Sequence, residues 1–181
     1  MTIEMDRVFG MANRATFKVP PIREFVERRV LNLPRSATTI DPFARESRYA
    51  DITNDLNPDY GCDFCMDALD FLRQFDDESI DCVLYDPPYS PRQVAECYKG
   101  FGYEVTSETT RSSWKFRHMD EVARILKPGG FLLSFGWNSN GAGKKRGFEV
   151  TRIRLVHHGG GSAHDTICME EVKRAQPVYI P

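Results

Sequence analysis

Apolar residues in the first half of the chain recur every three or four positions over 22–33. This spacing predicts an amphipathic helix that begins just after Pro20-Pro21 and ends before Pro34. The first dozen residues follow no regular pattern, and we expect segment 1–14 to be irregular. The other elements predicted in this half are strands over 37–40, 49–56 and 80–85 and a short helix over 67–75.

The second half begins with a long polar segment, 90–117, in which only a short helix over 92–98 is predicted. Long loops in small domains usually carry function, so we expect a substrate-binding loop here. Further predicted elements are a helix containing Met119, Val122, Ala123 and Leu126, a turn over 127–130, and strands over 131–135, 150–157 and 166–172. Strands alternating with helices, followed by an antiparallel pair, predict an α/β fold with a mostly parallel sheet and helices on both faces.

Composition and charge limit the classes of protein to which this fold could belong. The chain has 181 residues, of which 41% are hydrophobic and 28% charged, as in a single soluble domain covering 1–181. No apolar run approaches the roughly 20 residues that span a bilayer, so we expect a cytoplasmic protein with no membrane partner. The formal net charge of -2 argues against a strongly basic nucleic-acid-binding domain but leaves room for a local basic patch.

The cysteines indicate neither a disulfide framework nor a metal site. Their number, five, is odd, and their spacing is uneven, which is not a disulfide framework. Cys62 and Cys65 form one Cys-x-x-Cys pair, but no second pair of ligands stands at the spacing of a zinc site. We therefore expect two ordinary thiols and no metal.

Acidic residues follow the predicted strands one after another. In open α/β sheets, ligands bind beyond the carboxyl ends of the strands. Asp41 follows the first predicted strand, Asp55 or its neighbour Asn54 stands at the end of the second, Asp67 precedes a helix and Asp86 follows the strand over 80–85. Asp67 also suits the N-cap of that helix, and Asp41 suits a turn. Four carboxylates in these places are nevertheless many for structural purposes alone.

The most specific run is Asp86-Pro87-Pro88-Tyr89, hereafter the tetrad. Two prolines after a buried strand fix the backbone and remove two N–H donors, which leaves carbonyl oxygens with little local competition. A substrate amino group could donate to Asp86 and to the Pro87 carbonyl, while Tyr89 offers an aromatic face for a planar base. The alternative is a proline-stiffened loop with a core tyrosine.

These segments, in this order, resemble the N6-adenine DNA methyltransferases, in a small form without a separate target recognition domain. The resemblance covers roughly 16–172 and implies a Rossmann-like, S-adenosylmethionine-dependent methyltransferase fold. It implies transfer of a methyl group from S-adenosylmethionine to the N6 amino group of adenine in DNA, with the tetrad as the catalytic residues. It further implies a set of cofactor-binding residues: Phe17, Asp41, Pro42, Phe43, Ala44, Asp55, Leu56, Asp67 and Ala68.

One departure from the family lies after Ala44. Members of the family continue with a Gly-rich turn, whereas this chain continues with Arg45-Glu46-Ser47. The interval from Asp41 to Asp55 is also too short for the usual helix, so we expect the first crossover helix to be lost. Arg45 and Arg48 are candidates for the cofactor carboxylate; weaker cofactor binding, or a site completed by another subunit, would equally account for the departure.

Target recognition is assigned to segment 90–117, where aromatic residues alternate with basic ones. This mixture suits flipped or single-stranded bases. The expected substrate-binding residues are Tyr89, Arg92, Lys99 and Arg117. A solvated loop with a few packed aromatics is the alternative. The absence of a recognition region favours a homodimer, because a second subunit would extend the DNA-binding surface.

Three other functions stay open. Related enzymes use a similar loop to methylate amino groups of RNA or a protein glutamine. A non-catalytic, cofactor-binding accessory subunit would explain the altered turn after Ala44. Methylation of cytosine N4 is less expected, because those enzymes generally carry serine in place of Asp86.

Overall fold

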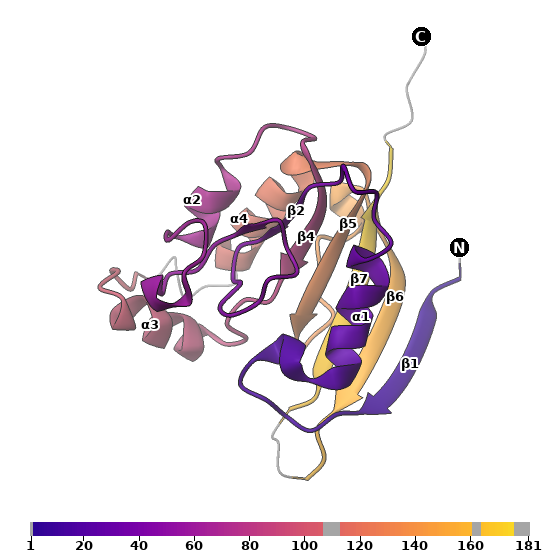
Figure 1. The fold of residues 1–181 in the computed structure, drawn as a ribbon, viewed down its shortest axis with the longest axis horizontal. Coiled ribbons are helices and arrows are strands. Elements are labelled where there is room, and N and C mark those ends of the chain that lie inside the picture. Colours follow the sequence, from indigo (N-terminus) through magenta and orange to yellow (C-terminus); the bar gives the residue numbers. More distant parts are fainter. Residues whose placement is uncertain (1, 107–112, 161–163, 176–181) are drawn as a thin grey trace.

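The computed structural model describes residues 2–106, 113–160 and 164–175. Within these residues one sheet has the strand order β1-β6-β7-β5-β4-β2-β3 (Figure 1). Its strands are β1 (Glu4–Phe9), β2 (Thr39–Asp41), β3 (Ile52–Thr53), β4 (Ile80–Tyr85), β5 (Leu126–Gly136), β6 (Phe148–His157) and β7 (Thr166–Lys173). Strand β7 runs antiparallel to β5 and β6, and every other adjacent pair is parallel. The predicted mostly parallel sheet with a terminal antiparallel pair is confirmed.

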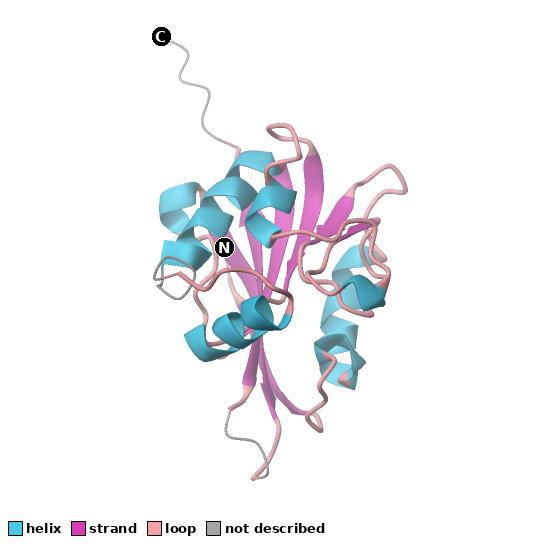
Figure 2. Cartoon of the chain, turned by 90° about the vertical axis from the view of Figure 1, so that its left-hand side faces the viewer, coloured by secondary structure: helices cyan, strands magenta, loops and turns pink. Residues whose placement is uncertain are grey.

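Helices cover both faces of the sheet (Figure 2). They are α1 (Pro20–Val30), α2 (Ala68–Leu72), α3 (Pro91–Gly100) and α4 (Ser113–Ile125), with short 3-10 turns η1 (Thr16–Lys18), η2 (Pro58–Tyr60) and η3 (Lys144–Arg146). One core cluster joins Phe25 and Val26 of α1 to β4, β5 and β7. A second cluster joins α2 and α4 to the opposite face, through residues such as Phe71 and Val122. No helix in the described part of the chain is long and apolar enough to cross a membrane.

The first crossover has no helix, as the sequence predicted. Strands β2 and β3 pair in parallel through only two residue pairs, and the ten residues between them form turns and loop. The strand predicted over 49–56 shrinks to two residues. Polar side chains replace the strand ladder here, since Asp51 accepts from the Thr39 N–H at 2.8 Å and Asp63 accepts from the Thr53 N–H at 2.8 Å. The region is therefore loop-rich where ligands usually bind.

Two further boundaries differ from prediction. Strand β5 begins at Leu126, which pairs with Ile80, so the turn predicted over 127–130 lies inside the strand as an irregularity. Gly129 has φ +84°, which a residue with a side chain rarely adopts. Segment 90–117, expected to be mainly a loop, contains α3 and the start of α4; residues 107–112 of that segment lie outside the described residues.

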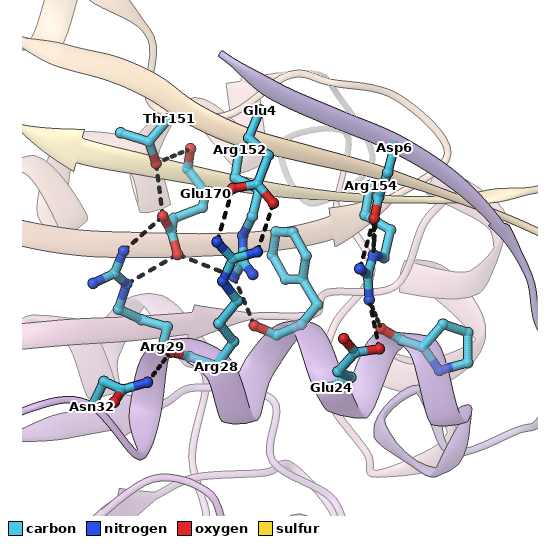
Figure 3. Close-up of polar contacts among 12 residues, drawn as sticks. Glu4, Asp6, Glu24, Arg28, Arg29, Asn32, Thr151, Arg152, Arg154 and Glu170 are labelled. Carbon is cyan, nitrogen blue, oxygen red and sulfur yellow. Dashed lines mark hydrogen bonds and ion pairs between the residues drawn. The ribbon is translucent and has the colours of Figure 1, made fainter. Parts of the chain in front are cut away.

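The expectation of an irregular N-terminus is wrong. Residues Glu4–Phe9 form β1, an edge strand parallel to β6. Its acidic residues face α1 and β6, where Glu4 pairs with Arg28 at 2.6 Å and Asp6 pairs with Arg154 at 2.6 Å (Figure 3). Charged residues are depleted in strands unless they are paired across the structure, and these arginines lie far away in the sequence. The strand therefore leaves no hydrophobic signature.

A buried ion cluster ties α1 to the same half of the sheet (Figure 3). The Glu170 carboxylate on β7 accepts from Arg29 at 2.9 and 3.0 Å, from Arg152 at 3.2 Å and from the Thr151 hydroxyl at 2.7 Å. The Arg152 guanidinium also donates to the Phe25 carbonyl and lies 3.8 Å from the centre of that ring. Burial favours the neutral acid, but the arginines outweigh it and lower the pKa of Glu170.

Candidate active site

The tetrad lies directly after β4, which is flanked by β2 and β5. The start of α3 fixes the loop, because the Tyr89 N–H donates to Gln93 Oε1 at 2.7 Å. Ser90 caps the helix by accepting from the Gln93 N–H at 3.3 Å, and Pro91 occupies its first position. Gln93, which the sequence did not mark as a site residue, thus positions Tyr89.

Asp86 has hydroxyl partners but no cation partner. Tyr89 Oη donates to Asp86 Oδ1 at 2.6 Å, and Thr16 Oγ1 lies 3.5 Å from Tyr89 Oη. No ion pair within 4 Å involves Asp86 among the described residues. Burial raises the pKa of Asp86, against the hydrogen bonds from Tyr89 and Thr16 and the charge of Arg45. When ionised, this carboxylate is a strong acceptor that a donor ligand could use.

Two cavities share Pro87, Pro88 and Tyr89 of the tetrad. The first cavity, about 420 Å³, is lined by all four tetrad residues and by most of the expected cofactor-binding residues: Pro42, Phe43, Asp55, Leu56 and Ala68. The second cavity, about 290 Å³, is lined by Pro87, Pro88 and Tyr89 and by Phe116, Trp137 and Asn138. A side cavity of about 280 Å³ adjoins the first and is lined by Phe17, Ala44, Arg45 and Asp86 among others.

Asp55 faces the first cavity from the end of β3. Its two oxygens accept from the N–H groups of Arg45 at 3.1 Å and Asn57 at 2.9 Å. Burial raises the pKa of Asp55 in spite of these bonds. The neighbouring Asn54 is buried and structural: its amide donates to the carbonyls of Pro42 and Met66, which joins two loops of the cavity.

Asp41 and Asp67 do not line the first cavity, although both were expected to bind the cofactor. Asp41 is fully buried, and its Oδ1 accepts from the Phe43 N–H at 2.9 Å. Asp67 caps α2 by accepting from the Leu69 N–H at 2.8 Å, as its alternative interpretation predicted. Because both carboxylates are used inside loops, they position Phe43 and Ala68, which do reach the cavity.

Helix α3 and the start of α4 contribute Tyr98 and Trp114 to the lining of the first cavity, and sequence reasoning missed this role. Tyr98 Oη donates to Asp67 and accepts from Trp114 Nε1 at 3.1 Å. Both rings line the cavity. Burial raises the pKa of Tyr98, as does its bond to Asp67. The signal available in the sequence was the four-residue spacing of Val94 and Tyr98 after a Ser-Pro helix start.

The expected basic substrate residues lie elsewhere. The Arg92 side chain is 87% exposed and pairs with Glu96 at 2.7 Å. Lys99 is exposed on α3, and Arg117 is half-buried on α4. None of the three lines a cavity beside the tetrad. Of the expected set, only Tyr89 lies at the tetrad.

His118 lies in the core and packs against one residue of the first cavity. His118 Nδ1 lies 2.9 Å from Tyr85 Oη in the core, and burial lowers the pKa of this histidine to about 3, so it is neutral. Its ring packs against Phe43, 5.9 Å between centroids, and so supports the cavity wall.

Cys62 and Cys65 contact the carbonyl oxygens of Arg45 and Leu56, and no cluster of metal-ligating side chains occurs within the described ranges.

Comparison with known proteins supports the fold. No protein-family model matches the sequence. TrmN from Thermus thermophilus superposes with a TM-score of 0.58 over 86% of this chain and 49% of that one, at 16% identity. A 1,6-didemethyltoxoflavin-N1-methyltransferase from Burkholderia thailandensis, solved with S-adenosylhomocysteine, superposes with a TM-score of 0.56 over 86% of this chain and 77% of that one, at 11% identity. The chain has the Rossmann-like fold of methyltransferases.

One curated relative is similar in sequence to part of this methyltransferase fold. A segment of 79 residues is 32% identical to the type II methyltransferase M.BamHI of Bacillus amyloliquefaciens. The segment is 40% of this chain and spans 17% of the length of that enzyme. The similarity in sequence therefore covers only part of this chain, whereas the similarity in fold covers most of it.

Proposed function

We propose that this chain transfers a methyl group from S-adenosylmethionine to the N6 amino group of adenine in DNA. The observation that carries the proposal is that the first and second cavities share Pro87, Pro88 and Tyr89 of the tetrad, and that Asp86 lines the first. Direct group transfer needs the donor and the acceptor in contact and aligned. Ligands in the two cavities would meet at these shared residues.

The residues of the first cavity fit S-adenosylmethionine. Its volume lies within the range of small-molecule sites. Asp55 can accept from ribose hydroxyls, and the apolar side chains of Leu56 and Ala68 suit an adenine ring. Arg45 supplies a cation for a carboxylate at the other end. When bound there, S-adenosylmethionine would supply an electrophilic methyl group.

Asp86 and the Pro87 carbonyl are the proposed acceptors for the substrate amino group. An adenine amino nitrogen is a weak nucleophile because its lone pair is delocalised into the ring. Two acceptors would favour a more tetrahedral nitrogen and stabilise the positive charge that develops on it. Asp86 suits this role because it has no cation partner among the described residues. The amino group would replace Tyr89 Oη as a donor to Asp86.

The second cavity is the proposed place for the acceptor base. Tyr89 and Trp137 present two rings whose centroids are 5.6 Å apart, and Asn138 adds an amide. Planar bases stack on such rings, with little dependence on sequence. A base inside a duplex cannot reach this cavity, so it must be flipped out or already unpaired. Nucleic acid is the partner that these rings favour, and a homodimer would extend its binding surface.

The test uses the full chain with S-adenosylmethionine labelled in the methyl group. Single-stranded DNA, duplex DNA, RNA and a protein mixture are offered as acceptors, and the labelled products are identified by chromatography. We expect label in N6-methyladenine from DNA and none with Asp86→Ala. Asp70→Ala is the matched control, because Asp70 is exposed on α2 and its ion pair in the described part of the chain is with Arg73.

Each other outcome has a definite meaning. Label found in RNA or protein alone rejects DNA as the substrate and favours the corresponding alternative. Labelling that survives Asp86→Ala rejects the role given to that carboxylate. Binding of S-adenosylmethionine without labelling of any acceptor favours an accessory, non-catalytic subunit.

A further inference from the structure

Arg45 has an unusual backbone. It is one of two non-glycine residues in the described part of the chain with a positive φ, here +49°. Side chains other than glycine rarely adopt this region, and such residues concentrate at functional sites. Arg45 lies in the turn region between β2 and β3 and carries a cationic side chain on a backbone that glycine adopts more readily.

The Arg45 side chain is held beside the cavities without an acidic partner. Nε donates to Tyr60 Oη at 3.3 Å, and Nη1 donates to the Arg14 carbonyl. Its own backbone N–H donates to Asp55 Oδ2. Arg45 forms no ion pair within 4 Å among the residues that the structure describes, and no hydrogen bond of Nη2 occurs within them. The guanidinium is therefore ordered but keeps donors for a ligand.

Arg45 lies where the first cavity and the side cavity adjoin. Arg45 is the one cationic residue that lines both the first cavity and the side cavity within the described residues. Asp55 and Asp86, the acids that line the first cavity, would repel a carboxylate placed beside them. A planar guanidinium binds carboxylates through paired N–H donors.

We propose that Arg45 binds the carboxylate of the amino-acid portion of S-adenosylmethionine. The inference rests on the proposed function, because it needs that cofactor in the first cavity.

Two neighbouring cations, Arg48 and Lys18, already have partners. Arg48 donates to the carbonyls of Arg45, Ser47 and Tyr60. Lys18 pairs with Glu46 at 2.5 Å and is largely exposed. Both line only the side cavity. Lys18→Gln is therefore a matched control that removes one positive charge from the same region.

The test compares two ligands by calorimetric titration of the full chain. S-adenosylhomocysteine has the amino-acid portion, whereas 5′-methylthioadenosine has the same adenosine thioether without it. We expect Arg45→Gln to weaken S-adenosylhomocysteine about 10- to 100-fold, because a hydrogen-bonded charge pair is lost. Affinity for 5′-methylthioadenosine should change less than about twofold. Lys18→Gln should leave both affinities within about threefold of the unchanged chain.

Thermal unfolding of each variant checks that it is folded. Arg45→Gly serves as a second variant, because it relieves the backbone and still removes the cation; it should lose S-adenosylhomocysteine affinity to the same extent. Equal loss of both ligands, or loss of neither, overturns the inference. Failure of the unchanged chain to bind either ligand instead rejects the proposed function and, with it, the inference.

Discussion

In the half of the sheet formed by β1, β6 and β7, the acids Glu4, Asp6 and Glu170 each contact an arginine. In the half formed by β2, β3 and β4, the acids Asp41, Asp55 and Asp86 form no ion pair within 4 Å among the described residues. They accept instead from backbone N–H groups and hydroxyls. Both halves contain buried carboxylates, so burial alone does not distinguish them.

The difference appears in the pKa values. Burial raises the pKa of Asp41, Asp55 and Asp86. For Glu170 burial acts in the same direction, but Arg29 and Arg152 outweigh it and lower the pKa. Glu170 is stabilised by cations of the chain, whereas Asp55 and Asp86, which line the first cavity, keep acceptor capacity and cost stability when charged. Unpaired, shifted acids beside a cavity are a mark of function.

The largest effect is expected from Asp86→Asn. The amide keeps the shape and removes the negative charge that would stabilise the developing cation, so we expect kcat for methyl transfer to fall about 10³-fold. The unfolding midpoint should stay the same or rise, because a buried charge is removed. Single-turnover transfer and thermal unfolding measure the two. A matching fall in stability would show that Asp86 is structural, like Glu170.

Glu170→Gln should have the opposite pattern. It leaves Arg29 and Arg152 without their buried partner, which we expect to cost about 3 kcal/mol of unfolding free energy. S-adenosylhomocysteine affinity of the folded fraction should not change. Denaturant unfolding and calorimetry provide the measurements. Glu149→Gln is the control, since its pair with Arg174 is exposed and should matter little. Loss of ligand affinity in Glu170→Gln would break the division between the halves.

Asp55→Asn should weaken S-adenosylhomocysteine about 10-fold, because hydrogen bonds from ribose hydroxyls to a charged acceptor are stronger than those to an amide. The unfolding free energy should change little, since the Asn oxygen can still accept one of the two N–H groups at Asp55. Calorimetry on the folded variant measures the affinity. Unchanged affinity would place the ribose away from Asp55.

The smallest effect is the pH dependence of Asp41→Asn. The folded-state pKa of Asp41 is raised, so its charge costs stability as the pH rises from the unfolded-state pKa through the folded one. Asn retains the acceptor for the Phe43 N–H. The variant should match the unchanged chain near pH 4 and exceed it by about 1 kcal/mol near pH 8. Denaturant unfolding at both pH values is the measurement, and a deficit at pH 8 would contradict it.

Sequence reasoning correctly located the features that depend on residues close together in the chain. The apolar run 80–85 is β4 with the bounds predicted, and the tetrad follows it. Asp41 and Asp67 stand at the expected strand and helix ends, but their side chains turn into the loops. Their direction depends on contacts that local pattern does not encode, such as Tyr98 meeting Asp67 from 31 residues away.

Long-range contacts explain the other errors of prediction. Strand β1 is stabilised by Arg28 and Arg154, which lie 24 and 148 residues from their acidic partners. The polarity of segment 90–117 suggested a loop, yet Val94, Tyr98 and Trp114 form a buried cluster there. The spacing of apolar residues shows only which face of a segment can be buried. Whether the segment becomes a strand, helix or loop also depends on the distant residues that pack against it.

Amide hydrogen exchange with and without saturating S-adenosylhomocysteine tests the central claim most directly. The account predicts slower exchange in the site half, at 43–45, 55–57, 66–69 and 89–98, because a ligand in the first cavity orders these segments. Exchange in β1 and β6 should change little, since their acids already have partners in the free protein. Protection confined to β1, β6 and β7, or binding that leaves the segments around Asp55 and Asp86 unprotected, would contradict the account.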